Sequence, residues 1–183
     1  VRLGNAAGEF EEAELYLDDS SGISVPEIKA KVRRMKDVDV VMIDYLGLLR
    51  SAVRKENRVQ EVSDITRNLK MMAKDLNIPV ICCAQLSRGG TEGRNKNHRP
   101  QLADLRESGS IEQDADIVLF LYRPDYYSGE LDEDKRSQID ESATELIVAK
   151  NRHGATGVVE MAFDKEFTRF RCVEKDYGND EQD

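Results

Sequence analysis

The chain has 183 residues, of which 39% are hydrophobic and 34% charged, so it can bury the core of one soluble domain. Its net charge of −9 argues against a protein that coats nucleic acid through bulk electrostatics. No apolar run approaches the roughly 20 residues that span a bilayer, and the first residues lack the core of a signal peptide, so we expect a cytoplasmic protein. The cysteines form no disulfide or ligand pattern, and we expect small apolar fillers in a reducing compartment: Cys82, Cys83 and Cys172.

The first half of the chain predicts helices that alternate with short apolar strands. Ser24 and Glu27 form a capping box, which predicts that a helix begins there. The clearest helix covers residues 57–76, where apolar side chains recur every three or four positions and charges occupy the other side. The strands expected in this half span residues 14–18, 38–43 and 78–84.

The second half predicts strands that end in a hairpin. The expected strands span residues 117–122, 144–149, 157–163 and 167–173, and the last two form a hairpin that turns at 164–166. An acidic loop or frayed helix is expected at 125–142. These elements predict an α/β fold with a mainly parallel sheet and an antiparallel edge hairpin. We find no internal domain boundary, so residues 1–183 form a single domain, with an acidic tail at 174–183.

Two of the predicted buried strands end in a polar side chain. Asp44 follows one strand and Gln85 follows the other. In nucleoside triphosphatases an acid in this position holds the water shell of the Mg²⁺ that bridges the phosphates, and an amide can contact the γ-phosphate or the attacking water. Taken alone, each side chain is better explained by a cap, a turn or a loop hydrogen bond, but two adjacent strands that end this way shift the balance toward a nucleotide site.

A pair of cations follows a later strand. Lys150 and Arg152 are two residues apart, so they project to the same side if the strand continues. Two such cations suit a triphosphate, where arginine neutralises charge that develops during phosphoryl transfer; the alternative is the charged start of a hairpin. The chain contains no Gly-x-x-x-x-Gly-Lys-Ser/Thr sequence, so it lacks a phosphate-cradling loop and cannot be a complete ATPase of that class.

The stretch 102–116 is too polar for a core, and its position predicts a loop-and-helix crossover between two apolar strands. Arg106 and Glu107 stand just before a Ser-Gly-Ser break centred on Gly109. Such a crossover presents charge and backbone at the carboxyl edge of the sheet, where α/β folds bind ligands. The basic segment ahead of it fits either a local contact with phosphates or a solvated loop, and its cations are Arg88, Arg94, Lys96 and Arg99.

The order and wording of these motifs resemble the C-terminal, RecA-like motor domain of the replicative DNA helicases of bacteria and their phages (the DnaB type). The most specific motif is Arg-Glu-Ser-Gly-Ser-Ile-Glu-Gln at 106–113. Met-Ile-Asp-Tyr-Leu at 42–46, Gln-Leu-Ser-Arg at 85–88 and Ala-Lys-Asn-Arg-His-Gly at 149–154 match in the same order. The resemblance extends from about residue 15 to residue 171.

The resemblance implies a partial RecA-like P-loop fold in a ring-shaped hexamer that hydrolyses ATP, with Mg²⁺, at subunit interfaces and moves along single-stranded DNA to unwind duplex. By position, Asp44 is the Walker-B acid and the Mg²⁺ site, and Gln85 is the γ-phosphate sensor. Lys150 and Arg152 would act on the neighbouring subunit's nucleotide, so the three strand tips would serve triphosphates. The residues that would grip the DNA backbone without reading bases are Arg106, Glu107 and Gly109. Primase and a helicase loader are the implied partners.

Several features depart from the family pattern. Gly47 stands where the family commonly has Gln, and the family's N-terminal domain, Walker-A loop and catalytic glutamate are absent. We therefore expect a fragment of a longer protein that alone neither binds ATP tightly nor unwinds DNA, and whose sheet exposes an unpaired strand edge. The alternatives are a non-catalytic module that binds DNA or other subunits, and another RecA-like ATPase.

Overall fold

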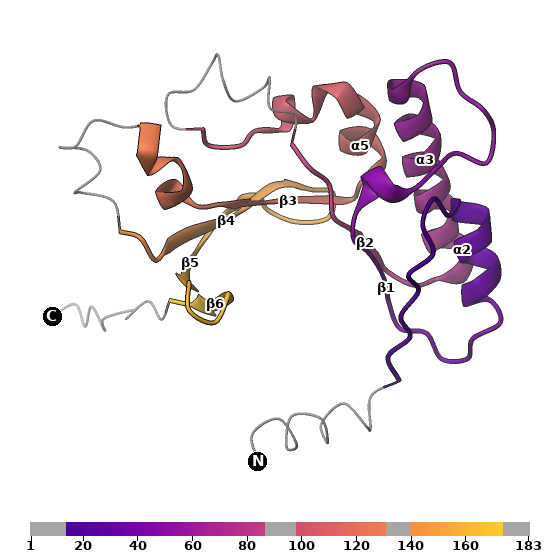
Figure 1. The fold of residues 1–183 in the computed structure, drawn as a ribbon, viewed down its shortest axis with the longest axis horizontal. Coiled ribbons are helices and arrows are strands. Elements are labelled where there is room, and N and C mark those ends of the chain that lie inside the picture. The colour runs from indigo at the N-terminus through magenta and orange to yellow at the C-terminus, as the bar shows by residue number, and fades with distance from the viewer. Residues whose placement is uncertain (1–13, 87–97, 131–139, 174–183) are drawn as a thin grey trace, which may run out of the picture.

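The computed structural model describes residues 14–86, 98–130 and 140–173. The described helices and strands form two sheets with helices packed against them (Figure 1). One sheet holds β1 and β2, which pair in parallel, and the other holds β3, β4, β5 and β6, which pair in antiparallel order. Both kinds of strand pairing expected from the sequence are therefore present, but parallel pairing is confined to the smaller sheet.

Helix α2 (Val25–Val32) begins where the sequence predicts it. The Glu27 carboxylate accepts hydrogen bonds from the Ser24 backbone N–H at 2.8 Å and from the Ser24 hydroxyl at 2.6 Å. These bonds satisfy a backbone donor that the first helical turn leaves unpaired. Val25, the first helical residue, is buried in the core, so the cap also fixes how α2 meets the rest of the molecule.

Helix α3 (Arg58–Leu76) confirms the predicted central helix. The side chain of Asn57 caps its start by accepting a hydrogen bond from the Gln60 N–H at 2.9 Å. Asn77 ends it in a left-handed conformation with φ of 55°. Its apolar stripe forms most of the larger core, whose buried members are Val25, Leu46, Leu49, Val62, Ile65, Leu69 and Met72.

The parallel sheet is short. Strand β1 (Val41–Ile43) pairs with β2 (Val80–Cys82), so both predicted strands are present but span three residues each. Apolar side chains on one face of this pair pack against the core beneath α3. The opposite face carries Met42 and Ile81, which are 71% and 52% exposed. Among the described residues, the core beneath α3 covers β1 and β2 from one side only.

The antiparallel sheet follows the predicted strand positions closely. Its strands are β3 (Ile117–Tyr122), β4 (Ala143–Asn151), β5 (Gly157–Asp164) and β6 (Arg169–Cys172). The predicted hairpin is confirmed by the β5–β6 pairing. Alternate residues of β3 face opposite ways, and the inward set packs against the crossover in a second core of Leu105, Val118 and Phe120.

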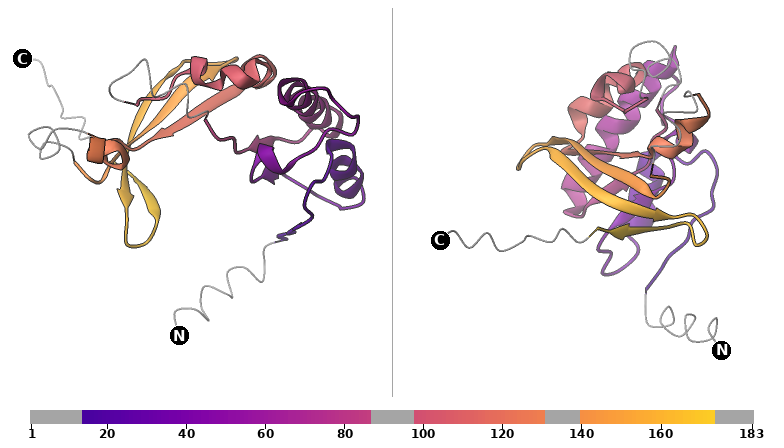
Figure 2. Two further views of the ribbon diagram at one scale, coloured as in Figure 1. Left: turned by 45° about the horizontal axis from the view of Figure 1, so that its top comes forward. Right: turned by 90° about the vertical axis from the view of Figure 1, so that its left-hand side faces the viewer.

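A helical crossover joins β2 to β3, as expected. It consists of the 3₁₀ helix η2 (Leu102–Ser108) and helix α5 (Gly109–Asp114), which packs against α3. Figure 2 shows this crossover above the larger sheet and next to α3. The remaining short 3₁₀ helices are η1 (Leu46–Leu48) and η3 (Pro124–Glu130). The η3 helix lies within the region expected to be an acidic loop or frayed helix.

Two details correct or extend the sequence expectations. The strand predicted at 14–18 is wrong, because these residues lie along the surface without regular structure, and Leu17 is 88% exposed. Apolar alternation makes a strand only where a neighbouring strand supplies hydrogen bonds.

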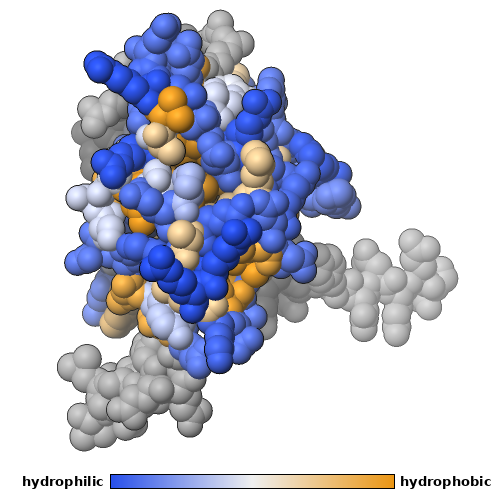
Figure 3. Space-filling model, turned by 90° about the vertical axis from the view of Figure 1, so that its right-hand side faces the viewer, coloured by the Kyte–Doolittle hydropathy of each residue, from blue (hydrophilic) through white to orange (hydrophobic). Residues whose placement is uncertain are grey.

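Among the described residues, β2 pairs only with β1, and β3 pairs only with β4, which agrees with the expected free strand edges. From the side of α2 and α3 the surface is mainly hydrophilic (Figure 3).

Candidate functional site

The ends of β1 and β2 bring Asp44 and Gln85 to the same edge of the parallel sheet. The Cys83 N–H donates to the Ile43 carbonyl at 2.9 Å, and the Leu46 N–H donates to the Cys83 carbonyl at 2.8 Å, so pairing continues past both strands. Because the strands are parallel, their carboxyl ends meet at one edge. Both Asp44 and Gln85 are exposed there and available to a ligand.

The turn after Asp44 is anchored in the core. The Asp44–Tyr45 peptide bond is cis, and the chain then enters η1, whose Leu46 is buried. A Cβ atom added to Gly47 would lie 2.3 Å from the Tyr45 ring. The Tyr45 ring therefore occupies the space that a side chain at position 47 would need, which is a physical reason for glycine where the resemblance led us to expect Gln.

The crossover carries the proposed DNA-contacting residues. Arg106 and Glu107 lie in the last turn of η2, and the structure describes their backbone but not their side chains. Gly109 begins α5 in a right-handed helical conformation, and a Cβ atom there would meet nothing within 4 Å. The expected break thus coincides with the change from 3₁₀ to α-helix, and it leaves open space beside the backbone.

Side chains of α3 fix the end of α5. The Thr66 hydroxyl donates to the Asp114 carboxylate at 2.6 Å. Lys70 forms an ion pair with Asp116, and this hydrogen bond is the main reason that the pKa of Asp116 lies below its ordinary value. Asp116 is therefore an anion over the neutral pH range, placed between α5 and the start of β3.

Lys150 and Arg152 reach the same end of α5 from β4. Strand β4 pairs with β3 so that Lys150 lies opposite Val118. The Lys150 ammonium donates to the carbonyl oxygens of Glu112 and Gln113, and the Arg152 guanidinium donates to the Gln113 carbonyl at 3.2 Å. The two cations do project to the same side, as predicted, but their described contacts are with α5 and, for Arg152, also with Asp116, rather than with Asp44 or Gln85.

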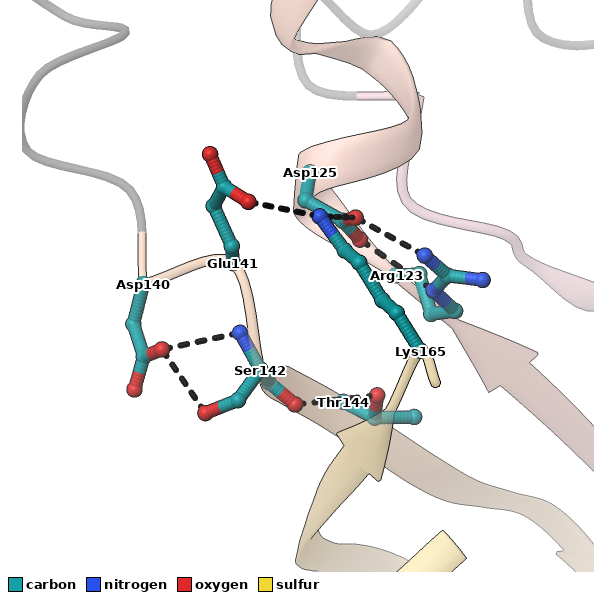
Figure 4. Close-up of polar contacts among 7 residues, drawn as sticks. All are labelled: Arg123, Asp125, Asp140, Glu141, Ser142, Thr144 and Lys165. Atoms are coloured by element: carbon teal, nitrogen blue, oxygen red, sulfur yellow. Dashed lines mark hydrogen bonds and ion pairs between the residues drawn. The ribbon is translucent and has the colours of Figure 1, made fainter. Parts of the chain in front are cut away.

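Sequence reasoning missed an ionic cluster beyond the end of β3. Asp125 receives two hydrogen bonds from Arg123, at 2.8 and 3.2 Å, and lies 3.1 Å from the Lys165 ammonium (Figure 4). Burial by itself would raise the pKa of Asp125, but Arg123 and Lys165 outweigh it, so the pKa lies below its ordinary value. Lys165 also pairs with Glu141 at 2.7 Å, and both partners raise the pKa of Lys165.

The same cluster continues into aromatic contacts. The Arg123 guanidinium lies over the Phe163 ring, 4.0 Å from its centroid, in a cation–π contact. Beside it is a pocket of about 180 Å³. The His98 and Tyr127 rings stack there with centroids 4.6 Å apart. The available signal was Arg-Pro-Asp at 123–125, directly after the strand predicted at 117–122, but this sequence does not reveal that Phe163 of β5 is the partner of Arg123.

The basic segment and the acidic tail lie largely outside the described residues. Of the four cations of the basic segment, the structure describes Arg99, which pairs with Glu145 at 2.6 Å.

The described part of the chain contains no group of three or more side chains that could hold a metal ion directly. Its helices include none long and apolar enough to cross a membrane. All three cysteines are free, but Cys83 and Cys172 are exposed, so the expectation of small apolar fillers is wrong for these two, whereas Cys82 is partly buried.

Comparison with protein families decides the relationship. The model of the DnaB-like helicase C-terminal domain matches residues 1–172. The chain belongs to this family. It is 46% identical over 182 residues to the replicative DNA helicase DnaC of Bacillus subtilis, and 45% identical over 178 residues to DnaB of Geobacillus stearothermophilus. These alignments cover 97% and 95% of the chain, but only 38% and 37% of the two relatives.

Solved structures of DnaB-like helicases share the fold. The chain is similar to a solved structure of an ATPase domain, with a TM-score of 0.83 and 42% identity over 94% of the chain and 60% of that domain. A DnaB-like replicative helicase studied for its interactions with primase gives a TM-score of 0.82 at 42% identity, covering 94% of the chain and 41% of that protein. The partial RecA-like α/β fold predicted from the sequence is therefore confirmed.

Proposed function

We propose that the chain forms the C-terminal part of the motor domain of an ATP-dependent replicative DNA helicase. The assembled enzyme hydrolyses ATP at the subunit interfaces of a hexamer and translocates on single-stranded DNA to unwind duplex. The observation that carries this proposal is the emergence of Asp44 and Gln85 side by side from paired parallel strands in a chain of this family. Residues 1–183 act as one unit, with 174–183 as an acidic tail.

Asp44 and Gln85 are proposed to serve the nucleotide of their own subunit. An exposed carboxylate at a strand end can hold water molecules of a Mg²⁺ ion that bridges the phosphates of ATP. An exposed amide on the next strand can donate to the γ-phosphate. The chain has no phosphate-cradling sequence motif, so we propose that the 183 residues alone bind ATP weakly and do not hydrolyse it.

Lys150 and Arg152 are proposed to serve the nucleotide of a neighbouring subunit. Their contacts lie at the end of α5, and the Arg152 side chain is 47% exposed, so its guanidinium can reach beyond its own subunit. Arginine and lysine supplied from outside neutralise the negative charge that develops during phosphoryl transfer. This division of the site between two subunits explains why the cations need not contact Asp44 or Gln85.

The crossover is proposed to hold the DNA backbone. Arg106 provides a cation, and Gly109 leaves open space in which a sugar–phosphate chain can approach the main chain. Glu107 lies between them on the last turn of η2. Contacts of this kind do not read bases, which suits a motor that must pass over every sequence. We further propose cytoplasmic location, and primase and a helicase loader as partners.

The binding of single-stranded DNA provides the test. Fluorescence anisotropy of a labelled oligothymidylate, measured at several salt concentrations, would compare the 183-residue chain with Arg106→Ala. The variant should bind more weakly, and its salt slope should be smaller by about 0.7, because Arg106 no longer neutralises a phosphate. Arg67→Ala is the matched control, because it removes the same charge from an exposed position on α3.

The possible results test different parts of the proposal. Equal weakening by Arg106→Ala and Arg67→Ala would contradict the proposed role of the crossover. Appreciable ATP turnover by the 183-residue chain would contradict the need for a Walker-A loop from outside. Retained DNA binding without turnover fits both a motor fragment and a non-catalytic binding module. Mixing the chain with a P-loop-containing subunit of the same family separates the two alternatives. If the chain is a motor fragment, the ATP turnover of that subunit should differ between the wild-type chain and its Arg152→Ala variant. If the chain is a binding module, the turnover should be the same with both.

A further inference from the structure

The end of α5 depends on side chains from elsewhere for its hydrogen bonds. The last carbonyl groups of any α-helix lack partners within the helix. Here the Lys150 ammonium bonds the Glu112 and Gln113 carbonyls, and the Arg152 guanidinium bonds the Gln113 carbonyl. Positive charge at this end also complements the helix dipole. A helix of six residues has little stability of its own, so it depends on contacts with the rest of the molecule, which are its packing on α3 and these two cations at its end.

A fixed anion keeps Arg152 at this position. The Asp116 carboxylate lies 3.6 Å from the Arg152 Nε, and the Asp116 carbonyl accepts a hydrogen bond from the Arg152 backbone N–H at 2.8 Å. Lys70 of α3 binds the same carboxylate and fixes its position. Arg152 is therefore held by the Gln113 carbonyl of α5 and by Asp116, although its side chain stays 47% exposed.

We infer that Lys150 and Arg152 act as a removable C-terminal cap on α5, and that a triphosphate which draws them away loosens the crossover that carries the DNA-contacting residues. This inference rests on the proposed function of the two cations. Asp116 is then the positioning residue that returns Arg152 to the cap. Phosphate bound at the C-terminal end of α5 would thereby change how firmly the chain is held at Gly109, at the N-terminal end of the same helix.

Competition between two acceptors is the physical basis of the link. A phosphate oxygen carries negative charge, so a lysine or arginine cation binds it as an ion pair, more strongly than it binds a neutral carbonyl oxygen. A guanidinium that turns toward phosphate gives up the Gln113 carbonyl, because its planar donors have a fixed direction. The whole of α5 has only six residues, and Gly109 is about one turn from Gln113, so fraying at Gln113 extends to Gly109.

Hydrogen exchange of the 183-residue chain, followed by mass spectrometry, tests the inference with inorganic tripolyphosphate as the probe. Peptides that cover residues 109–117 should exchange about five- to tenfold faster when tripolyphosphate is present, because the cap is withdrawn. The double variant Lys150→Gln/Arg152→Gln should exchange fast without the probe and should no longer respond to it. Sodium chloride at matched ionic strength controls for screening.

A matched control and a binding measurement complete the design. Lys165→Gln/Arg171→Gln removes two cations from the β5–β6 hairpin, and should leave the tripolyphosphate response of residues 109–117 intact. Calorimetry on the wild-type chain and both variants shows whether the probe binds to Lys150 and Arg152. Binding there without faster exchange would overturn the cap inference alone. No binding at those residues would overturn the cap inference and also the proposed phosphate role of the two cations.

Discussion

Replacing Ile65 with alanine should destabilise the part of the molecule that presents Asp44 and Gln85. The Ile65 side chain is 1% exposed and lies in the core between α3 and the parallel sheet. The substitution removes about three buried carbons, which at about 0.8 kcal/mol each gives about 2.4 kcal/mol of lost transfer free energy. The cavity left behind raises the expected loss of unfolding free energy to about 3–4 kcal/mol.

Urea unfolding followed by circular dichroism measures this loss. The matched control is Val59→Ala on the same helix, where the side chain is 49% exposed and the expected change is within about 0.5 kcal/mol. We expect the free energy of unfolding to differ widely between the two variants, with the same dependence on urea concentration. A similar change for both, or a loss below about 1 kcal/mol for Ile65→Ala, would show that this core does not support the two strand ends.

Three further predictions follow from the electrostatics and packing of the site. The pKa of Asp125 is lowered in the folded state, so its ion pairs stabilise the fold fully above the ordinary carboxyl pKa of 3.8, and this stabilisation is lost as pH falls through the folded pKa. The difference in unfolding free energy between wild type and Asp125→Asn, measured in urea, should therefore shrink below about pH 4. A difference that does not depend on pH would contradict this. Burial raises the pKa of the Cys82 thiol to about 12, so iodoacetamide at about pH 8 should modify the exposed Cys172 before Cys82. Peptide mapping would measure the two modification rates, and equal rates would be inconsistent with the burial of Cys82. Gly47→Ala should displace the Tyr45 ring, visible as a tyrosine chemical-shift change that a surface Gly157→Ala control does not produce.

Local patterns in the sequence predicted the regular elements well. The capping box of Ser24 and Glu27 and the apolar periodicity of α3 act between residues three or four positions apart, so the sequence displays them directly. The failed strand at 14–18 shows the limit of this reasoning. Its alternation is visible in sequence, but a strand also needs a partner edge, which none of the described residues supplies there.

The candidate site was predicted in part. Asp44 and Gln85 follow buried strands, and parallel pairing then requires their ends to share an edge, which the structure shows. The contacts of Lys150 and Arg152 with α5 were not foreseen, because nearly 40 positions separate them from Glu112 and Gln113. The ionic contact between Asp125 and Lys165 was missed for the same reason.

The sequence alone determined the order of helices and strands from residue 24 onward, the resemblance to the family, and the polar side chains that follow the buried strands. Only the tertiary structure decided that Lys150 and Arg152 close the end of α5, and that Asp116 lies between Lys70 and Arg152. The physical reason is range. Helix caps and periodicity arise among near neighbours in the chain, whereas these ionic contacts exist only after β4 has paired with β3 and α5 has packed on α3.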